Sequence, residues 1–223
     1  DAIDLHGELE YLNEVYGNTI ENILTGGGVG LGNTGGTAPS NHSKSGPNNH
    51  IHDNVIRNSR EGVVVSMGTP DTLIENNIIE NTTSVENAVG INILNGPGTR
   101  ILHNIIRNNT ATNYWGILLE HDRGDQNANF IGAGDPQNVQ IEGNVLTGNA
   151  NGIQLQAGVN ILVTKNRLNN LGTNYEKAAG VTATEVWLSS DSTLSGLTLN
   201  AGSFVFDPNL TSQTANVPTS QSK

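Results

Sequence analysis

The feature that most constrains the fold is an internal repeat made of two short segments that alternate along the chain. The first segment reads Asn-x-Ile/Leu-x-Asn and begins at Asn18, Asn54, Asn77, Asn104 and Asn166, with a variant at Asn144. The second reads Gly-Ile/Val-x-Leu/Ile/Val-x and begins at Gly28, Gly62, Gly90, Gly116 and Gly152, with weaker copies at Ala2 and Gly180. Starts of the second segment are 26, 34, 28, 26, 36 and 28 residues apart. Self-similarity at such a period is typical of solenoids.

Both segments alternate apolar and other residues with a period of two, which predicts short strands rather than helices. The 27 Gly and 33 Asn among 223 residues suit tight corners, because both residue types tolerate a left-handed backbone. We therefore predict an all-β fold, a single-stranded right-handed parallel β-helix of about seven coils over residues 1–188. Residues 189–223 are expected to form a C-terminal cap and tail. Asparagines at equivalent corners should stack in a ladder, for which we select Asn22, Asn58, Asn81, Asn108 and Asn170.

Two of the steps are long because they contain polar, glycine-rich insertions, at Thr34 to Asn49 and at Asp122 to Asp135. Insertions leave a solenoid as loops, often on its binding face. Both follow the same strand position, so we expect them to project from the same edge. At the start of the chain, Asp1 falls within a predicted strand with no cap before it. We therefore expect a fragment or mature piece of a longer protein.

Composition excludes several functions. The formal net charge is −11 with only ten Lys and Arg, which argues against a nucleic-acid partner, since phosphate binding needs clustered basic residues. No apolar run of about 18 residues occurs, so we predict no membrane span. The absence of Cys excludes disulfides, thiolate metal sites and Cys nucleophiles.

The x positions of the Gly-led segments should point outward and stack into two columns. The first column contains Asp4, Gly30, Val64, Asn92, Leu118 and Gln154, and the second His6, Gly32, Ser66, Leu94, Glu120 and Gln156. Asp4 and His6 would then share a face, with Glu8 just beyond and a bare patch at Gly30 and Gly32 beside them. The first insertion, with His42 and Lys44, leaves the same column. This face predicts a shallow groove that could bind a polysaccharide.

Asp4 and His6 are the candidate catalytic pair. A histidine exchanges protons near neutral pH, and a neighbouring carboxylate can hold its tautomer or bind a cation that neutralises a uronate. Proton abstraction next to a carboxylate is the first step of both lyase and epimerase chemistry. The alternative is that both side chains are simply solvated on an exposed strand.

The segment Asp1-Ala2-Ile3-Asp4-Leu5-His6-Gly7-Glu8 resembles the Tyr-Gly-Phe-Asp-Pro-His-Glu motif of the mannuronan C5-epimerase catalytic module, within the carbohydrate-binding and sugar-hydrolase β-helix group. The resemblance implies a catalytic role for Asp4 and His6, a polysaccharide partner and an extracellular or secreted location. The sequence departs from the family where its Tyr falls at Asp1, and where a further Asp, one coil on, falls at Gly32. Phage tailspike depolymerases and extracellular β-helix proteins share the coil pattern.

A second polar cluster is Glu120-His121-Asp122-Arg123-Gly124-Asp125. Its acids could bind Ca²⁺, which prefers oxygen ligands, with Asp122 and Asp125 as the candidate metal ligands. The alternative is a solvated turn with local ion pairs. Glu120 faces the same way as His6, but about four coils and roughly 19 Å away, so it could contact only a distant part of the substrate.

Aromatic and histidine pairs add two further candidates. Tyr114 and Trp115 could form a platform on which a sugar stacks, or could cap a corner. His50 and His52 flank Ile51 and should lie on one side of a strand. They are either a metal-binding pair or two exposed histidines at the entrance to a coil.

Three functions are compatible with these residues. The first is an epimerase or lyase acting on a uronic-acid polymer, in which Asp4 and His6 transfer protons while Lys44 or Arg123 neutralises substrate carboxylates. Glu8, His42, Glu120 and Trp115 would also contact the substrate. The second is a non-catalytic carbohydrate-binding or adhesion module of an extracellular or phage fibre protein. The third is a tailspike-like depolymerase, for which Asp4 with Glu8 or Glu10 would supply the carboxylate pair.

Overall fold

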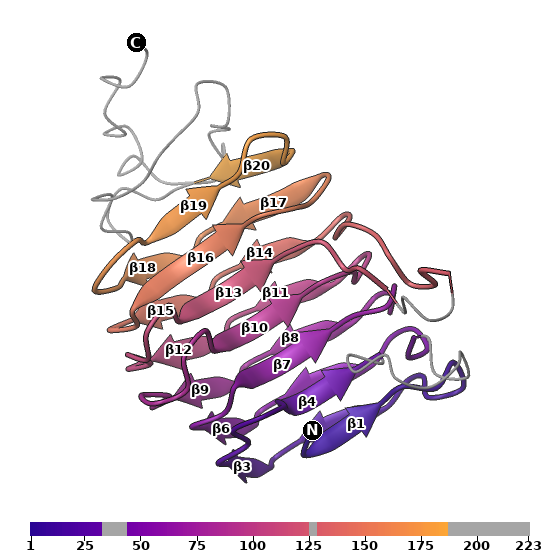
Figure 1. Cartoon of the computed structure of the whole chain (residues 1–223), viewed down its shortest axis with the longest axis horizontal. Helices are drawn as coiled ribbons and strands as arrows, with labels where there is room; N and C mark the ends of the chain where they lie inside the picture. The colour runs from indigo at the N-terminus through magenta and orange to yellow at the C-terminus, as the bar shows by residue number, and fades with distance from the viewer. Residues whose placement is uncertain (33–43, 125–128, 187–223) are drawn as a thin grey trace.

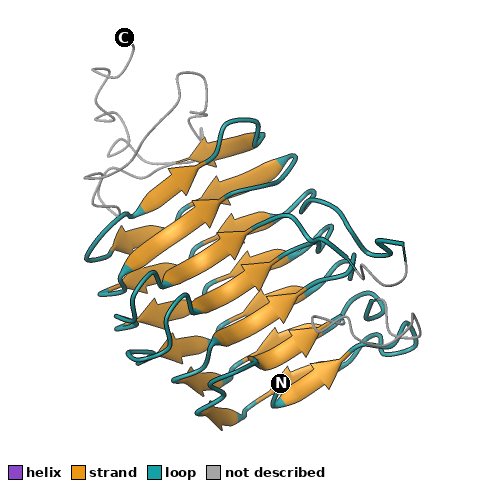
Figure 2. Ribbon diagram, in the orientation of Figure 1, coloured by secondary structure: helices purple, strands orange, loops and turns teal. Residues whose placement is uncertain are grey.

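The computed structural model describes residues 1–32, 44–124 and 129–186. These residues form an all-β parallel β-helix with no helix (Figure 2). Three strands occur in most coils, and equivalent strands of successive coils pair in parallel, so β1 and β20 lie at opposite ends of the stack (Figure 1). The predicted fold class is confirmed, and the tail predicted for 189–223 lies outside the described residues.

The strands form three sheets, which we name A, B and C. Sheet A consists of β1 (Ile3–Leu5), β4 (Gly27–Leu31), β7 (Glu61–Val65), β10 (Val89–Ile93), β13 (Trp115–Leu119), β16 (Asn151–Leu155) and β19 (Tyr175–Lys177). Sheet B consists of β2 (Glu14–Tyr16), β5 (His50–His52), β8 (Leu73–Glu75), β11 (Arg100–Leu102), β14 (Gln140–Glu142), β17 (Ile161–Thr164) and β20 (Ala183–Val186). Sheet C consists of β3 (Thr19–Glu21), β6 (Val55–Arg57), β9 (Ile78–Glu80), β12 (Ile105–Arg107), β15 (Val145–Thr147) and β18 (Arg167–Asn169).

The register of sheet A confirms the predicted first outer column. Asp4 pairs with Gly30, and the series continues through Val64, Asn92 and Leu118 to Gln154. The inward positions between these residues are aliphatic, partly buried in β1 and almost completely buried from β4 to β16. They make one continuous core along the axis, which supplies the main stabilisation by removing apolar surface from water.

The prediction that a further copy of the repeat begins at Gly180 is wrong. Ile153 pairs with Tyr175, so the last step on sheet A is 22 residues rather than 28. This strand has no Gly-led pattern, because the large Tyr175 side chain fills the core where other coils have an aliphatic residue. Gly180 lies in the turn beyond the strand, with a φ of +94°.

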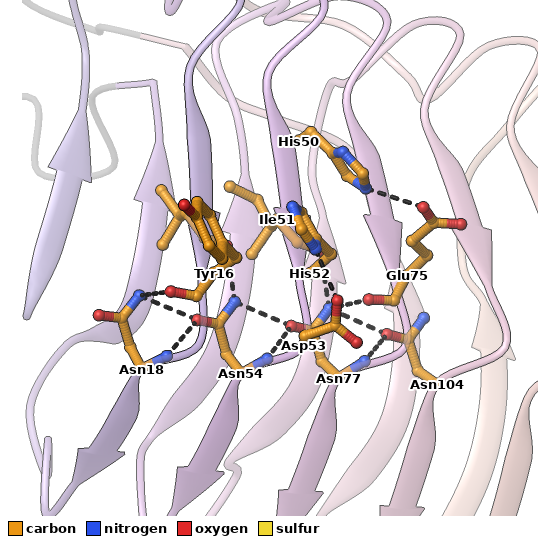
Figure 3. A network of polar contacts seen from close by, with 11 residues as sticks. Tyr16, Asn18, His50, Ile51, His52, Asp53, Asn54, Glu75, Asn77 and Asn104 are labelled. Atoms are coloured by element: carbon orange, nitrogen blue, oxygen red, sulfur yellow. Dashed lines mark hydrogen bonds and ion pairs between the residues drawn. The ribbon is translucent and has the colours of Figure 1, made fainter.

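The asparagine ladder is present, and its main column uses the first Asn of each motif. Its members are Asn18, Asn54, Asn77, Asn104, Asn144 and Asn166. At each step one Oδ1 accepts hydrogen bonds from both the backbone N–H and the Nδ2 of the preceding Asn, as between Asn77 and Asn104 at 3.0 Å each (Figure 3). The Nδ2 of Asn77 also donates to the carbonyl of Ile51 at 2.8 Å.

The last Asn of the motif instead occupies an outer corner with a left-handed backbone. Asn22, Asn58, Asn81 and Asn108 all have φ between 48° and 64°. Their side chains are exposed or half-buried, because the αL residue turns the chain away from the core. The ladder prediction is confirmed in part. Asn58 Nδ2 donates to Asn22 Oδ1 at 2.8 Å, and Asn170 stacks between Asn149 and Asn174 in a second, shorter ladder. The main ladder, however, is formed by the first Asn of each motif.

Candidate functional site

A groove of about 550 Å³ runs over the outer face of sheet A, from β1 to the end of β13. Its floor is formed partly by Val64 and Leu94. Among its lining residues are four acids, Asp1, Asp4, Glu61 and Glu120, and one base, Arg60. The groove lies on the face predicted from the outer columns, and its lining is strongly acidic.

At the centre of the groove, the amide of Asn92 lies between two glutamates. Its Nδ2 donates to Glu61 Oε1 at 3.0 Å and to Glu120 Oε1 at 3.0 Å. The two carboxylate oxygens are therefore at most twice that distance, 6.0 Å, apart. Asn92 is only 4% exposed, and its Oδ1 is buried with no hydrogen-bond partner among the described residues. A buried and unpaired carbonyl oxygen is uncommon in folded proteins.

Three consecutive strands bring these side chains together. Glu61 is the first residue of β7, Asn92 occupies an outward position in β10, and Glu120 directly follows β13. Neighbouring strands lie about 4.8 Å apart, so the two glutamates flank the asparagine from opposite sides. Among the described residues, neither glutamate forms an ion pair with a basic side chain.

The predicted pair Asp4 and His6 lies at the β1 end of the groove. The Nδ1 of His6 is 2.7 Å from Asp4 Oδ2, and the two side chains are 38% and 39% exposed. The expectation that they share a face is confirmed, and their role remains a prediction. Four strand pairings separate β1 from β13, which agrees with the expected separation of Glu120 from this pair.

The patch at Gly30 and Gly32 is not bare, contrary to expectation. The carboxylate of Asp1 lies over Gly30, where an added Cβ would be 2.3 Å from Asp1 Oδ2. The same carboxylate accepts a hydrogen bond from the backbone N–H of Gly27 at 2.6 Å. Gly32 is buried against the backbone carbonyl of Ser66. Glycine at these positions allows close packing and leaves no open surface.

The other residues predicted near this end are dispersed. Glu8 is exposed beyond β1, and Lys44 is half-buried between β4 and β5. The Oε2 of Glu10 accepts a hydrogen bond from the Gly7 backbone N–H at 2.9 Å, so its carboxylate fastens a turn. His42 lies outside the described residues.

The second insertion folds back against the turns that follow β7 and β10. Asp122 is buried, and its carboxylate accepts hydrogen bonds from the backbone N–H of Met67 at 2.6 Å and of Gly124 at 2.7 Å. These contacts account for the buried carboxylate without a metal ion. Arg123 is exposed, and Asp125 lies outside the described residues. The Ca²⁺ site at Asp122 and Asp125 remains a prediction.

The aromatic pair before the segment that begins at Gly116 is divided between core and surface. Tyr114 is completely buried, and burial raises the pKa of its hydroxyl. It therefore cannot form part of a platform for a sugar. Trp115 is half-buried as the first residue of β13, and its contact with substrate remains a prediction.

The family model described as "Right handed beta helix region" matches residues 11–195. The chain belongs to the right-handed β-helix family. This family fits carbohydrate-active and adhesion-type β-helix proteins generally. No protein of established function matches the chain significantly. No helix among residues 1–32, 44–124 and 129–186 is long and apolar enough to cross a membrane.

Sequence reasoning identified part of this β-helix protein's groove and missed its centre. Asn92 and Glu120 were both placed in the outer columns, but their contact through the amide was not expected. Glu61 was missed because it precedes Gly62, where the pattern predicts a corner. The available signal was that Glu61, Asn92 and Glu120 occupy three successive coils on one face.

Proposed function

We propose that this chain is a polysaccharide-active β-helix protein that holds a glycan in the groove over sheet A and hydrolyses it with Glu61 and Glu120. The observation that carries the proposal is the pair of carboxylates held by one buried amide. The Oε1 atoms of Glu61 and Glu120 are at most 6.0 Å apart. This limit is close to the separation of about 5–5.5 Å between the two carboxyl groups of retaining glycosidases.

In such a reaction one carboxylate attacks the anomeric carbon as the bond to the leaving sugar oxygen breaks. The other carboxyl group gives its proton to that oxygen. Water then displaces the covalently bound carboxylate and gives one proton to the residue that acted as acid, which restores both groups. Asn92 would act as a positioning residue, because its Nδ2 holds one oxygen of each glutamate and fixes their separation.

The charge of the groove favours a neutral glycan over a uronic-acid polymer. Four acids and one arginine line it, and like charges in a shared cleft repel a polyanion. A bound cation such as Ca²⁺ would be required before a uronate could lie against these carboxylates.

A second candidate is the epimerase or lyase reaction on a uronic-acid polymer. It is favoured by the 2.7 Å contact between Asp4 and His6, which suits a proton-transfer pair at one end of the groove. For both candidates we propose an extracellular or secreted location. A binding-only adhesion module is the remaining possibility.

The test incubates the protein with panels of neutral and uronate polysaccharides and measures new reducing ends, unsaturated uronate and epimer ratio separately. We expect reducing ends from a neutral glycan, lost in Glu61→Gln and in Glu120→Gln but retained in Glu86→Gln, which changes an exposed glutamate away from the groove. In Glu61→Ala and Glu120→Ala, azide should give a glycosyl azide of inverted configuration with the variant that lacks the nucleophile, and one of retained configuration with the variant that lacks the acid. Unsaturated or epimerised product lost in His6→Ala would instead establish the second candidate. Retention on a glycan gel without any product would establish a binding module.

A further inference from the structure

On sheet B, away from the groove, three possible metal ligands converge on the outer surface. They are Glu14 on β2 and His50 and His52 on β5, and one ligand atom from each lies within 4.8 Å of the others. The register places Glu14 directly beside His50. His50 and His52 alternate on one strand, and their rings stack with centroids 3.9 Å apart (Figure 3). The expectation that both histidines lie on one side of a strand is confirmed.

The hydrogen bonds around the two histidines match those of metal-binding imidazoles. The Nδ1 of His52 is 2.8 Å from Asp53 Oδ2, and the Nε2 of His50 is 2.9 Å from Glu75 Oε1 (Figure 3). A histidine that binds a metal typically donates its other ring N–H to a carboxylate, which fixes the tautomer. Each carboxylate here would leave the second ring nitrogen as the electron-pair donor.

The surroundings hold the donors in place and leave one side accessible. The Tyr16 ring stacks on His52 at a centroid distance of 5.1 Å with nearly parallel planes. A hollow of about 240 Å³ adjoins Glu14 and His50 and is lined also by Asp71 and Arg100. Water or a small ligand could complete the coordination from this hollow.

We propose that Glu14, His50 and His52 form an open binding site for a divalent transition-metal ion, with Zn²⁺ as the preferred ion. Two imidazoles and one carboxylate, with the fourth position open, are a ligand set typical of Zn²⁺. Two donors on a tetrahedral Zn²⁺ lie about 3.3 Å apart, given Zn–N distances of about 2.0–2.1 Å. Metal binding would therefore draw the three ligand atoms together from their present spacing of up to 4.8 Å. Ca²⁺ and Mg²⁺ prefer all-oxygen ligands, so the site should discriminate against both.

The experiment titrates the untagged 223-residue chain with Zn²⁺ and with Ca²⁺ by calorimetry, and with Co²⁺ by visible absorption. We expect one equivalent of Zn²⁺, no heat from Ca²⁺, and the intense d–d bands of tetrahedral Co²⁺. His50→Ala/His52→Ala should weaken Zn²⁺ binding by at least about 100-fold, and Asp53→Asn by about 10–100-fold, as for partners of metal-bound histidines.

The matched control is His121→Ala, since His121 also contacts a carboxylate, Asp135 at 2.6 Å, but belongs to no such cluster among the described residues. It should leave Zn²⁺ binding unchanged. Circular dichroism of each variant checks that the β-helix is retained, which the partial exposure of His50 and His52 favours. Absence of Zn²⁺ binding, binding that persists in the double variant, or equal binding of Ca²⁺ would each overturn the proposal. The outcome is independent of the hydrolytic proposal, whose residues lie on sheet A.

Discussion

A buried glutamate on sheet C and two half-buried glutamates over sheet A differ in the groups that bind their carboxylates. Glu80 on sheet C is 6% exposed, and its two oxygens accept hydrogen bonds from Arg57 Nε at 2.8 Å and Arg107 Nε at 2.7 Å. Glu61 and Glu120 over sheet A share only the neutral amide of Asn92. A carboxylate neutralised within the protein stabilises the fold, whereas one held by a neutral donor keeps its charge available to a ligand.

The same contrast separates the asparagines. Asn77, Asn104 and Asn144 lie inside the coil, where their side-chain Oδ1 and Nδ2 atoms are hydrogen-bonded along the ladder. Asn92 lies outside, with an unpaired buried Oδ1 among the described residues. Polar groups that satisfy one another are explained by folding alone, whereas an unpaired buried group needs a further explanation, which our proposal supplies for Asn92 because that residue also lines the groove.

The largest expected effect is on catalysis. Glu120→Gln and Glu61→Gln should each lower kcat/KM at least about 10³-fold, or about 4 kcal/mol, because each removes an acid, base or nucleophile. The free energy of unfolding should change by less than about 0.5 kcal/mol, since Gln keeps an acceptor for the Asn92 amide. Kinetics on the glycan that the polysaccharide panel identifies measures kcat/KM, and chemical denaturation measures the free energy of unfolding.

The comparison fails if Glu80→Gln lowers activity as much as Glu120→Gln does. It would also fail if either sheet A variant unfolds readily, since the glutamates would then be structural.

The next effect is on the ladder. Asn104→Ala should lower the free energy of unfolding by about 2–4 kcal/mol, because it leaves buried partners at Ile74 O, Asn77 N and Asn144 Oδ1 with fewer hydrogen bonds. Asn113→Gly is the control: its exposed side chain makes one hydrogen bond, to Asn87, and Gly tolerates the left-handed backbone at this position, with φ +59°, so stability should change by less than about 0.5 kcal/mol. Denaturant titration of both variants measures the difference, and equal effects would contradict a structural ladder.

A smaller effect is expected on the stability of the protein at acid pH. Hydrogen bonds from Arg57, then Arg107, hold the pKa of Glu80 below its ordinary value of 4.5, against the opposing effect of burial. As the pH falls, Glu80 therefore takes up a proton in the unfolded chain before it does so in the folded protein. The stabilisation that ionised Glu80 gives at neutral pH is lost as the pH drops below about 4.5 toward the lower pKa of Glu80 in the folded protein. Glu80→Gln should cost about 1–2 kcal/mol at pH 7 and make the stability less dependent on pH in this window.

Denaturation at several pH values between neutral and acid compares Glu80→Gln with the unmodified protein. Identical pH profiles would show that the arginine pair does not stabilise ionised Glu80.

The smallest effect is expected at His6. His6→Ala should change the free energy of unfolding by less than about 0.5 kcal/mol, because the side chain is more than a third exposed. Hydrolysis by the glutamate pair should stay within about threefold, equivalent to less than 1 kcal/mol. A destabilisation of several kcal/mol would make His6 a packing residue and remove the epimerase or lyase candidate.

Several features were predictable because each depends on a local rule repeated many times. Alternating apolar residues define the strands, and Asn or Gly supplies the left-handed corner after them, as at Asn58 and Gly148. The outer column from Asp4 to Gln154 follows from the pairing of equivalent strands. The last coil broke the rule because Tyr175 packs where the pattern required an aliphatic residue.

By itself the sequence determined that this chain winds as a stack of coils, and which residues of the Gly-led segments face outward. Only the tertiary structure decided which outward residues touch. The contact of Glu61 with Asn92, and of Glu14 with the histidines of β5, depends on where each strand begins and on how each corner turns. Periodicity fixes the spacing between coils, but these local displacements of a few ångströms decide whether two carboxylates share one amide.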